Sequence, residues 1–260
     1  MTGVAGKTRP TLGFATFTLV MVALFVGLGL WQLQRRSEKH ALIAMLTERL
    51  AAEPEALPSS SQWSTLTPAK DEFRRVHLTA TYVRPDAMIY SSGSAVREDV
   101  SGPGTWAFLP AVLPGGETVV VNAGFAQNTM QDRAQQDRAV APLIMAQPVE
   151  LTGYIRFPEQ AGWLTPAPNV AKRLWFNRDH LAMARALGWG RAGSIAPFYI
   201  DLERPVPANA IPKPGPLQVH LKDDHLQYAI TWFGLAAAVL VAFGIWWWGR
   251  RRTVSAPVPR

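Results

Sequence analysis

The sequence predicts a membrane protein in which two transmembrane helices, one near each end of the chain, flank a β-rich α+β extramembrane domain that is barrel-like or sandwich-like. Residues 12–34 and 228–248 contain no charged side chain. At about 1.5 Å of rise per residue, a helix of either segment spans the roughly 30 Å hydrocarbon core of a bilayer. Between them, short segments of alternating apolar and polar residues are separated by turn-forming residues, which is typical of a compact domain of short strands.

The first apolar segment is expected to remain as a membrane anchor. It is longer than the apolar region of a signal peptide, and Arg35 and Arg36 follow it in place of a small-x-small cleavage pattern. Gly27, Trp31 and Gln34 share one helical face. This face either meets a partner helix or serves ordinary packing and interfacial anchoring.

The central domain is predicted from a change of period. Apolar residues from Leu42 to Leu50 keep helical spacing, so the first helix continues until Glu53-Pro54 ends it. Further on, apolar residues alternate with polar ones, which favours half-buried strands. A short helix is expected at 128–138 and another at 179–187, the second capped by Gly188. The expected strands are 76–82, 88–90, 106–113, 118–122, 149–156, 174–176, 198–201 and 217–220.

The charge distribution gives no reason to expect nucleic-acid binding. The formal net charge is +7, but eight of the 26 basic residues flank the two apolar segments. The other 18 share residues 37–224 with all 19 acidic residues, so the central domain is close to neutral. The basic surface that a phosphate backbone requires is therefore not predicted.

The basic residues instead predict an orientation in the membrane. Three arginines at 250–252 follow the second span and two aspartates at 223–224 precede it, which places the C-terminus in the cytoplasm. Two spans then place the N-terminus there too, although the basic residues around the first span favour the reverse. The expected location is a bacterial inner (plasma) membrane with the central domain in the periplasm, and an organellar inner membrane is the alternative. The expected divisions are a cytoplasmic N-terminus (1–11), a first span (12–34), an extracytoplasmic domain (35–224), a second span (225–248) and a cytoplasmic basic tail (249–260).

No motif predicts catalysis. The segment Gly102-Pro-Gly104-Thr-Trp-Ala107 fits a nucleotide-binding pattern only superficially, because it contains a proline and leads into a strand rather than a helix. The sequence has no Walker loop, zinc-protease motif or nucleophile elbow, and its lack of cysteine excludes disulfides and thiolate metal sites. The protein is therefore not expected to be an enzyme.

His225 is the candidate metal ligand among the five histidines. It lies where the second span begins, about one helical turn before Tyr228 and two before Trp232, and the three are expected to share a face. An imidazole with aromatic neighbours at the membrane edge could ligate a haem iron. Alternatively, it marks the start of the helix and hydrogen-bonds lipid headgroups. The other histidines, His40, His77, His180 and His220, are expected on solvated surfaces.

Pairing of the two helices would add neighbours to His225. Both helices meet the same side of the membrane at 31–36 and 225–228, so Trp31 could lie beside His225. Arg35 or Arg36 could then pair with a haem propionate, with the aspartates that precede His225, or with lipid phosphate.

Six segments in a fixed order carry a family resemblance. They are Gly29-Leu-Trp-Gln-Leu-Gln-Arg35, Gly102-Pro-Gly104, Gly116-Glu-Thr-Val-Val-Val-Asn122, Trp175-Phe-Asn-Arg-Asp179, Pro197-Phe-Tyr-Ile-Asp201 and His225-Leu-Gln-Tyr-Ala-Ile-Thr-Trp-Phe-Gly-Leu-Ala236. Together they resemble the Surf1 (Shy1) family of cytochrome c oxidase assembly factors over nearly the whole chain. The chain departs from the family pattern at Ala123 and Phe125, where the family usually has Arg and Trp, which puts a function of that loop in doubt. It also has Asp223-Asp224 where an Asn-Asn pair is usual.

The resemblance implies a role in maturing a haem-copper oxidase of the aa3 type, by transient binding of haem a and delivery to the catalytic subunit. It implies His225 as the iron ligand, and position adds Tyr228, Trp232, Trp31 and Arg35 around it. The expected partners are oxidase subunit I, other oxidase assembly proteins and membrane lipid. The alternative is a scaffold that stabilises assembly intermediates without binding haem.

Overall fold

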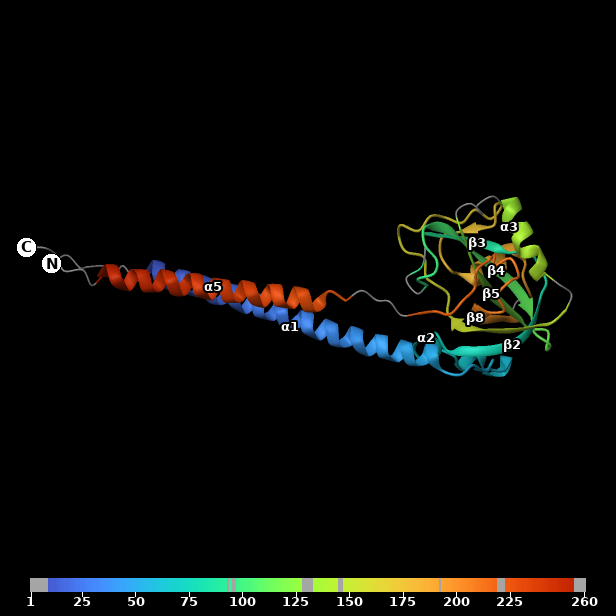
Figure 1. The fold of residues 1–260 in the computed structure, drawn as a ribbon, viewed down its shortest axis with the longest axis horizontal. Coiled ribbons are helices and arrows are strands. Elements are labelled where there is room, and N and C mark those ends of the chain that lie inside the picture. The colour runs from blue at the N-terminus through green and yellow to red at the C-terminus, as the bar shows by residue number, and fades with distance from the viewer. Residues whose placement is uncertain are drawn as a thin grey trace, which may run out of the picture. The chain divides into compact units, whose positions relative to one another are not determined.

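The computed structural model describes residues 9–92, 94, 97–127, 133–144, 147–191, 193–218 and 223–254. It divides into two compact units, seen in Figure 1. The first, here called the helix pair, combines Met1–Ala44 with Leu221–Arg260. The second, here called the β-domain, comprises Met45–His220.

The helix pair contains α5 (His225–Val254) and most of α1 (Arg9–Ala51), whose last turns from Met45 belong to the β-domain. Both are long and apolar enough to cross a membrane, over Leu12–Ala51 and His225–Arg251. In α1 a 3-4 repeat of buried or half-buried positions runs through 18, 22, 25, 29, 32 and 36, and in α5 through 225, 229, 232, 236, 239, 243 and 246. Such a repeat forms the seam of two helices that cross at a small angle.

The seam joins the helices in antiparallel order. Phe25 stacks on Trp232 with ring centroids 5.7 Å apart, and nearer the N-terminus Phe14 contacts Trp246 at 4.6 Å. Between Phe25 and the C-terminal end of α1, a Cβ placed on Gly29 would lie 2.5 Å from Cε1 of the Phe233 ring. Glycine at this position therefore admits the aromatic ring and lets the two helices approach closely.

Of the two roles considered for the face of Gly27, Trp31 and Gln34, contact with a partner helix is not met by α5. All three residues are exposed, and Trp31 retains 51% of its accessible surface. These residues are exposed because the seam passes through Gly29, and they lie outside it.

The β-domain is built on one mixed sheet. Within the described residues its strand order is β1-β2-β6-β8-β5-β4-β3-β7. The pairs β1–β2, β5–β8 and β3–β7 are parallel, and the others are antiparallel. The strands are β1 (Glu55–Ala56), β2 (Arg75–Tyr82), β3 (Ala87–Ser92), β4 (Pro103–Val112), β5 (Thr118–Gln127), β6 (Val149–Arg156), β7 (Leu174–Trp175) and β8 (Ile195–Arg204).

This sheet curls but is not a closed barrel. The end of β2 meets the end of β4 through only two residue pairs, Thr81 with Val112 and Tyr82 with Ala111. The predicted fold class is confirmed, because two long apolar helices near the ends of the chain flank an α+β extramembrane domain. Of the two expected forms, the curled single sheet corresponds to an incomplete barrel.

Alternation along the strands produces two apolar cores. On β8, Phe198, Ile200 and Leu202 belong to one core, whereas Tyr199 belongs to the other. Trp63 packs edge-on against Phe198 in the first core, with ring centroids 5.6 Å apart. The short helices are η1 (Ser60–Thr65), α2 (Pro68–Asp71), α3 (Arg133–Val140), η3 (Ala141–Leu143) and α4 (His180–Leu187).

The sequence predicted most of these elements. The strands expected between 76 and 201 are all present, and α4 has the expected cap, with Gly188 at φ 66°. Residues 217–218 are not a strand, which corrects the last of the eight expected segments, and 219–220 lie outside the described residues. The helix expected at 128–138 is described from Arg133 onward, and 128–132 also lie outside.

Gly124 provides a test of the close packing around β5. Its φ is +128°, and a Cβ there would lie 2.3 Å from the carbonyl carbon of Lys213. We expect Gly124→Ala to lower the free energy of unfolding by about 3 kcal/mol or more, because both the backbone and its neighbour must move. Gly102, at φ +72° with nothing within 4 Å of a Cβ, is the control, and its change to Ala should cost about 1 kcal/mol. Equal losses in denaturant unfolding of the full chain in detergent would contradict this account.

Candidate functional site

Polar residues continue the helix seam at the end where α5 begins. They are Gln32, Arg36 and His40 of α1, each one helical turn from the next, and Asp223 and His225 at the start of α5. We call these five residues the seam cluster. Gln32 and Arg36 continue the repeat that passes through Gly29 and are half-buried, whereas His40, one turn further, is exposed.

His225 is held by a hydrogen bond to α1. Its Nδ1 lies 2.7 Å from Oε1 of Gln32. The amide oxygen can only accept, so Nδ1 carries the hydrogen and donates it. In a neutral imidazole the lone pair is then on Nε2. No hydrogen bond of Nε2 occurs among the described residues, so this nitrogen is available to a ligand.

Asp223 joins the cluster together. Its Oδ1 accepts from the backbone N–H of His225 at 3.1 Å, and its Oδ2 accepts from Nε2 of His40 at 2.7 Å. Nε of Arg36 lies 3.6 Å from the same Oδ2. Desolvation acts to raise the pKa of Asp223, but the hydrogen bonds from His40 and the His225 N–H outweigh it and hold the pKa below its usual range. An ionised carboxylate therefore sits at the start of α5, where a negative charge stabilises the helix.

The structure brings together only part of the predicted site. His225 and Trp232 both lie on the seam. Tyr228, one helical turn after His225 on the same α5, is 56% exposed and lies at the edge of that face rather than against α1. The seam follows steps of four and three from His225, through Ala229 to Trp232, and Tyr228 lies beside it.

Of the two arginines considered, Arg36 is the one that reaches Asp223. Arg35 instead binds Glu38 of its own helix, with Nη1 3.0 Å from Oε2, and both side chains are exposed. Gln32 and His40 were not recognised in the sequence. The signal that could have found them is the polar continuation of the repeat, at 32, 36 and 40, beyond the apolar seam.

His180 is buried, which corrects its expected place on a solvated surface. Its Nε2 lies 3.0 Å from the carbonyl oxygen of Ala196 and donates to it, and its ring packs against Tyr199. Burial lowers the pKa of His180 to about 4, although the hydrogen bond to Ala196 opposes the shift. The side chain is turned inward because it joins the start of α4 to β8.

Two of the segments that carry the family resemblance meet in the β-domain. Nδ2 of Asn122 donates to Oδ1 of Asp201 at 2.9 Å, and Nη1 of Arg156 donates to Oδ2 of Asp201 at 3.2 Å. Ala123 and Phe125, where the chain departs from the family pattern, are buried within β5 and not in a loop as expected. These contacts give the segments a structural role.

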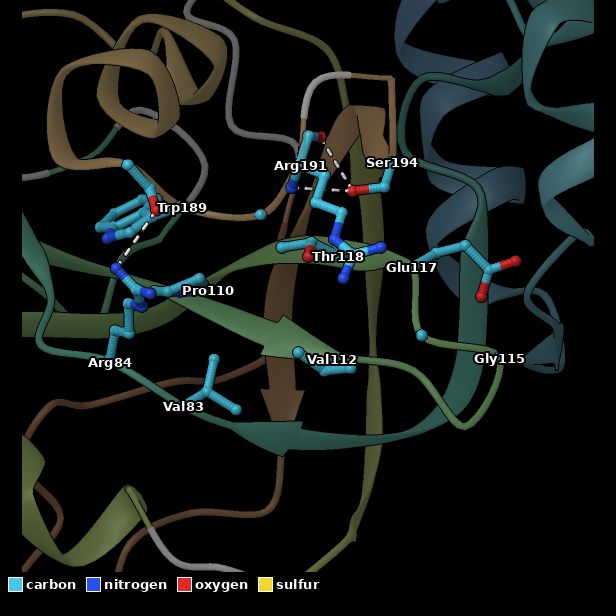
Figure 2. Close-up of a pocket in the computed structure, with 13 residues that line it drawn as sticks. Val83, Arg84, Pro110, Val112, Gly115, Glu117, Thr118, Trp189, Arg191 and Ser194 are labelled. Carbon is cyan, nitrogen blue, oxygen red and sulfur yellow. Dashed lines mark hydrogen bonds between the residues drawn. The ribbon is translucent and has the colours of Figure 1, made fainter.

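A cavity of about 680 Å³ lies elsewhere in the β-domain, as Figure 2 shows. Arg84 and Arg191 line it, and Nη1 of Arg84 donates to the carbonyl oxygen of Gly188 at 3.2 Å. None of the site residues expected from the sequence lines this cavity.

Comparison with known proteins decides the family. The model described as the SURF1 family matches residues 19–237. The chain belongs to the SURF1 family. The match begins within α1, includes the β-domain and ends within α5, so both Gln32 and His225 lie inside it.

The sequences of named relatives align with this SURF1 family member over most of its length. Surfeit locus protein 1 of rat is 32% identical over 243 residues, which cover 90% of this chain and 76% of the relative. The human protein of the same name is 31% identical over 232 residues, covering 85% and 72%. A SURF1-like protein of Monosiga brevicollis is 28% identical over 269 residues, covering 98% and 96%. The resemblance seen in the sequence is confirmed.

The buried imidazole of His180 predicts a pH dependence of stability. Above its ordinary pKa of 6.5 the ring is neutral in both states; between 6.5 and about 4 the unfolded chain takes up a proton that the folded chain does not. The folded state therefore loses about 2 kcal/mol from this group between pH 7 and pH 5. In denaturant unfolding at both pH values, His180→Gln should remove that loss and the exposed control His77→Gln should retain it. An unchanged pH dependence in His180→Gln would show that the ring does not titrate in this way.

Proposed function

We propose that this SURF1 family protein assists the assembly of a haem-copper (aa3-type) cytochrome c oxidase by transiently holding haem a at His225. The proposal rests on family membership and on one observation, the hydrogen bond of 2.7 Å between Nδ1 of His225 and Oε1 of Gln32. That bond orients the imidazole and leaves the lone pair of Nε2 for iron.

The residues around His225 fit such a group in part. The imidazole is half-buried at the end of an apolar helix pair, which suits an apolar macrocycle. Tyr228 and Trp31 are exposed and could offer their rings to it. Trp232 is already stacked on Phe25, so its role is to hold the helices together. When bound, the haem would supply an iron that accepts the Nε2 lone pair.

Arg35 would need to change its partner to contact a haem propionate. It forms an exposed pair with Glu38 within one helix, and such pairs contribute little free energy. Arg35 would therefore lose little free energy if it left Glu38 to bind a propionate. Arg36, which lies near Asp223, is the less accessible of the two arginines. A single histidine ligand beside an exchangeable ion pair suits a protein that must release its cargo.

The proposal also includes a location, an orientation in the membrane and a set of partners. The two apolar helices would place the protein in a bacterial inner membrane, with both termini in the cytoplasm and the β-domain in the periplasm. The partners would be oxidase subunit I, other oxidase assembly proteins and membrane lipid. No catalytic step is proposed for the chain.

The proposal predicts how haem occupancy responds to the seam cluster. The full chain would be purified in detergent from cells that make haem a, and its visible spectrum recorded. His225→Ala should abolish or alter the haem absorbance. Gln32→Leu, which removes the acceptor but keeps the size, should lower occupancy by about tenfold, as is usual when an outer-shell partner of a metal ligand is lost. Gln34→Leu is the control, because Gln34 binds Glu38 on the exposed face.

A spectrum without haem in the unsubstituted protein would contradict haem binding and favour a scaffold that stabilises oxidase assembly intermediates. A haem spectrum that His225→Ala leaves unchanged would remove His225 from the site. Equal losses in Gln32→Leu and Gln34→Leu would show that the seam hydrogen bond does not orient the ligand.

A further inference from the structure

A second cavity lies in the β-domain beside α3, separate from the seam cluster. Its volume of about 380 Å³ falls in the range of small-molecule sites. Six residues line it: Met88, Tyr90, Thr105, Arg133, Lys172 and Leu174.

Three strands supply its walls. Tyr90 of β3 is paired with Thr105 of β4, and Met88 of β3 with Leu174 of β7. Because residues paired across strands share a face of the sheet, all four lie on the same side. Thr105 thus lines the cavity together with the apolar side chains of Met88 and Leu174 and the ring of Tyr90.

The hydroxyl of Thr105 has no hydrogen-bond partner among the residues that the structure describes. Thr105 is only 2% exposed, so this Oγ1 is buried. A buried polar group without a hydrogen bond raises the free energy of the folded state. A ligand that hydrogen-bonds to Thr105 would therefore be favoured here.

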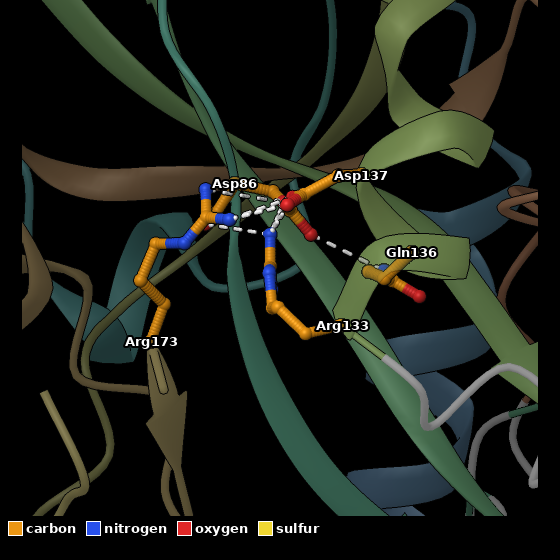
Figure 3. A network of polar contacts seen from close by, with 5 residues as sticks. All are labelled: Asp86, Arg133, Gln136, Asp137 and Arg173. Atoms are coloured by element: carbon orange, nitrogen blue, oxygen red, sulfur yellow. Dashed lines mark hydrogen bonds and ion pairs between the residues drawn. The ribbon is translucent and has the colours of Figure 1, made fainter. Parts of the chain in front are cut away.

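Arg133 brings a fixed positive charge to the same cavity. Figure 3 shows its guanidinium in a polar network with Asp86, Gln136, Asp137 and Arg173. Nη2 of Arg133 binds both Asp86, which is fully buried, and Asp137. Nη2 of Arg173 binds both oxygens of Asp137 at 2.7 Å, and Nε2 of Gln136 donates to Asp86 at 3.2 Å. Nε and Nη1 of Arg133 are buried and make no hydrogen bond to any described residue.

The charges around the cavity favour an anion. The network holds two arginines and two aspartates and is close to neutral as a unit. Lys172 adds a further positive charge at the cavity, is exposed, and has no ion pair within the part of the chain that the structure describes. None of the described lining residues is acidic.

We propose that this cavity binds a small organic monoanion, a carboxylate attached to an apolar body about the size of one aromatic ring. The carboxylate would accept hydrogen bonds from Thr105 and from Arg133 or Lys172, as charge-assisted bonds of this kind are strong. The apolar body would lie against Met88, Tyr90 and Leu174. Inorganic phosphate fits less well, because it would leave these apolar walls without a contact.

Methyl NMR of the full chain in detergent tests the proposal, with benzoate as the probe. The chain has seven methionines, and Met88→Leu assigns the signal of Met88 among the 13C-labelled methyl groups. Benzoate should shift the Met88 signal saturably. Benzamide, which has the same shape without the charge, and inorganic phosphate should each bind at least about fivefold more weakly. Absence of a saturable shift with benzoate, or equal or stronger binding of benzamide or phosphate, would overturn the proposal.

Two substitutions locate the anion within the cavity. Lys172→Met keeps the length of the side chain and should weaken benzoate binding by about fivefold. Thr105→Val keeps the shape, removes the hydroxyl without a partner and should also weaken binding. Lys70→Met, at an exposed lysine of α2 outside the cavity, is the matched control and should leave binding unchanged. The proposal is wrong if Lys172→Met and Lys70→Met give the same affinity as the unsubstituted chain.

Discussion

The packing of Phe233 against Gly29 sets how closely α1 and α5 approach and which residues face each other. Because a Cβ at position 29 would meet the ring at 2.5 Å, the two backbones are close at this point. The 3-4 repeat continues along both helices. One turn further along α1, and about two turns from Phe233 toward the start of α5, it brings His225 to Gln32 at 2.7 Å. The position of His225, the candidate iron ligand, thus depends on an apolar contact between Phe233 and Gly29 that takes no part in binding.

The change from apolar to polar residues along one seam explains how a histidine can be held at the end of an apolar helix pair. Where the seam excludes water, a hydrogen bond is stronger than on an open surface, and an unpaired polar group is more costly. Gln32 satisfies Nδ1 of His225, while Asp223 satisfies the backbone N–H of the same residue. The ring is therefore fixed in orientation with one nitrogen still available, which is the property that a ligand for iron needs.

Local patterns in the sequence predicted the apolar helices and most strands, but not the contacts that join distant segments. Alternation over 76–82 identifies β2 without any knowledge of its neighbours. The apolar span of α1, in contrast, looks alike on every side, so the sequence did not show that Gly29 rather than Gly27 faces α5. His180 and the network around Asp86 were not recognised for a similar reason. Burial of His180 depends on α4 lying against β8, and the network joins α3 to residues next to β3 and β7.

The tautomer of His225 tests the central claim most directly, because it reports the seam hydrogen bond without any need for haem. The measurement is the 15N NMR spectrum of the imidazole in the 15N-histidine-labelled full chain, with the signal assigned by His225→Ala. We expect a neutral ring protonated at Nδ1 and bare at Nε2, and a shift toward the Nε2–H form in Gln32→Leu. A ring protonated at Nε2 in the unsubstituted protein, or a tautomer that Gln32→Leu does not change, would contradict this account.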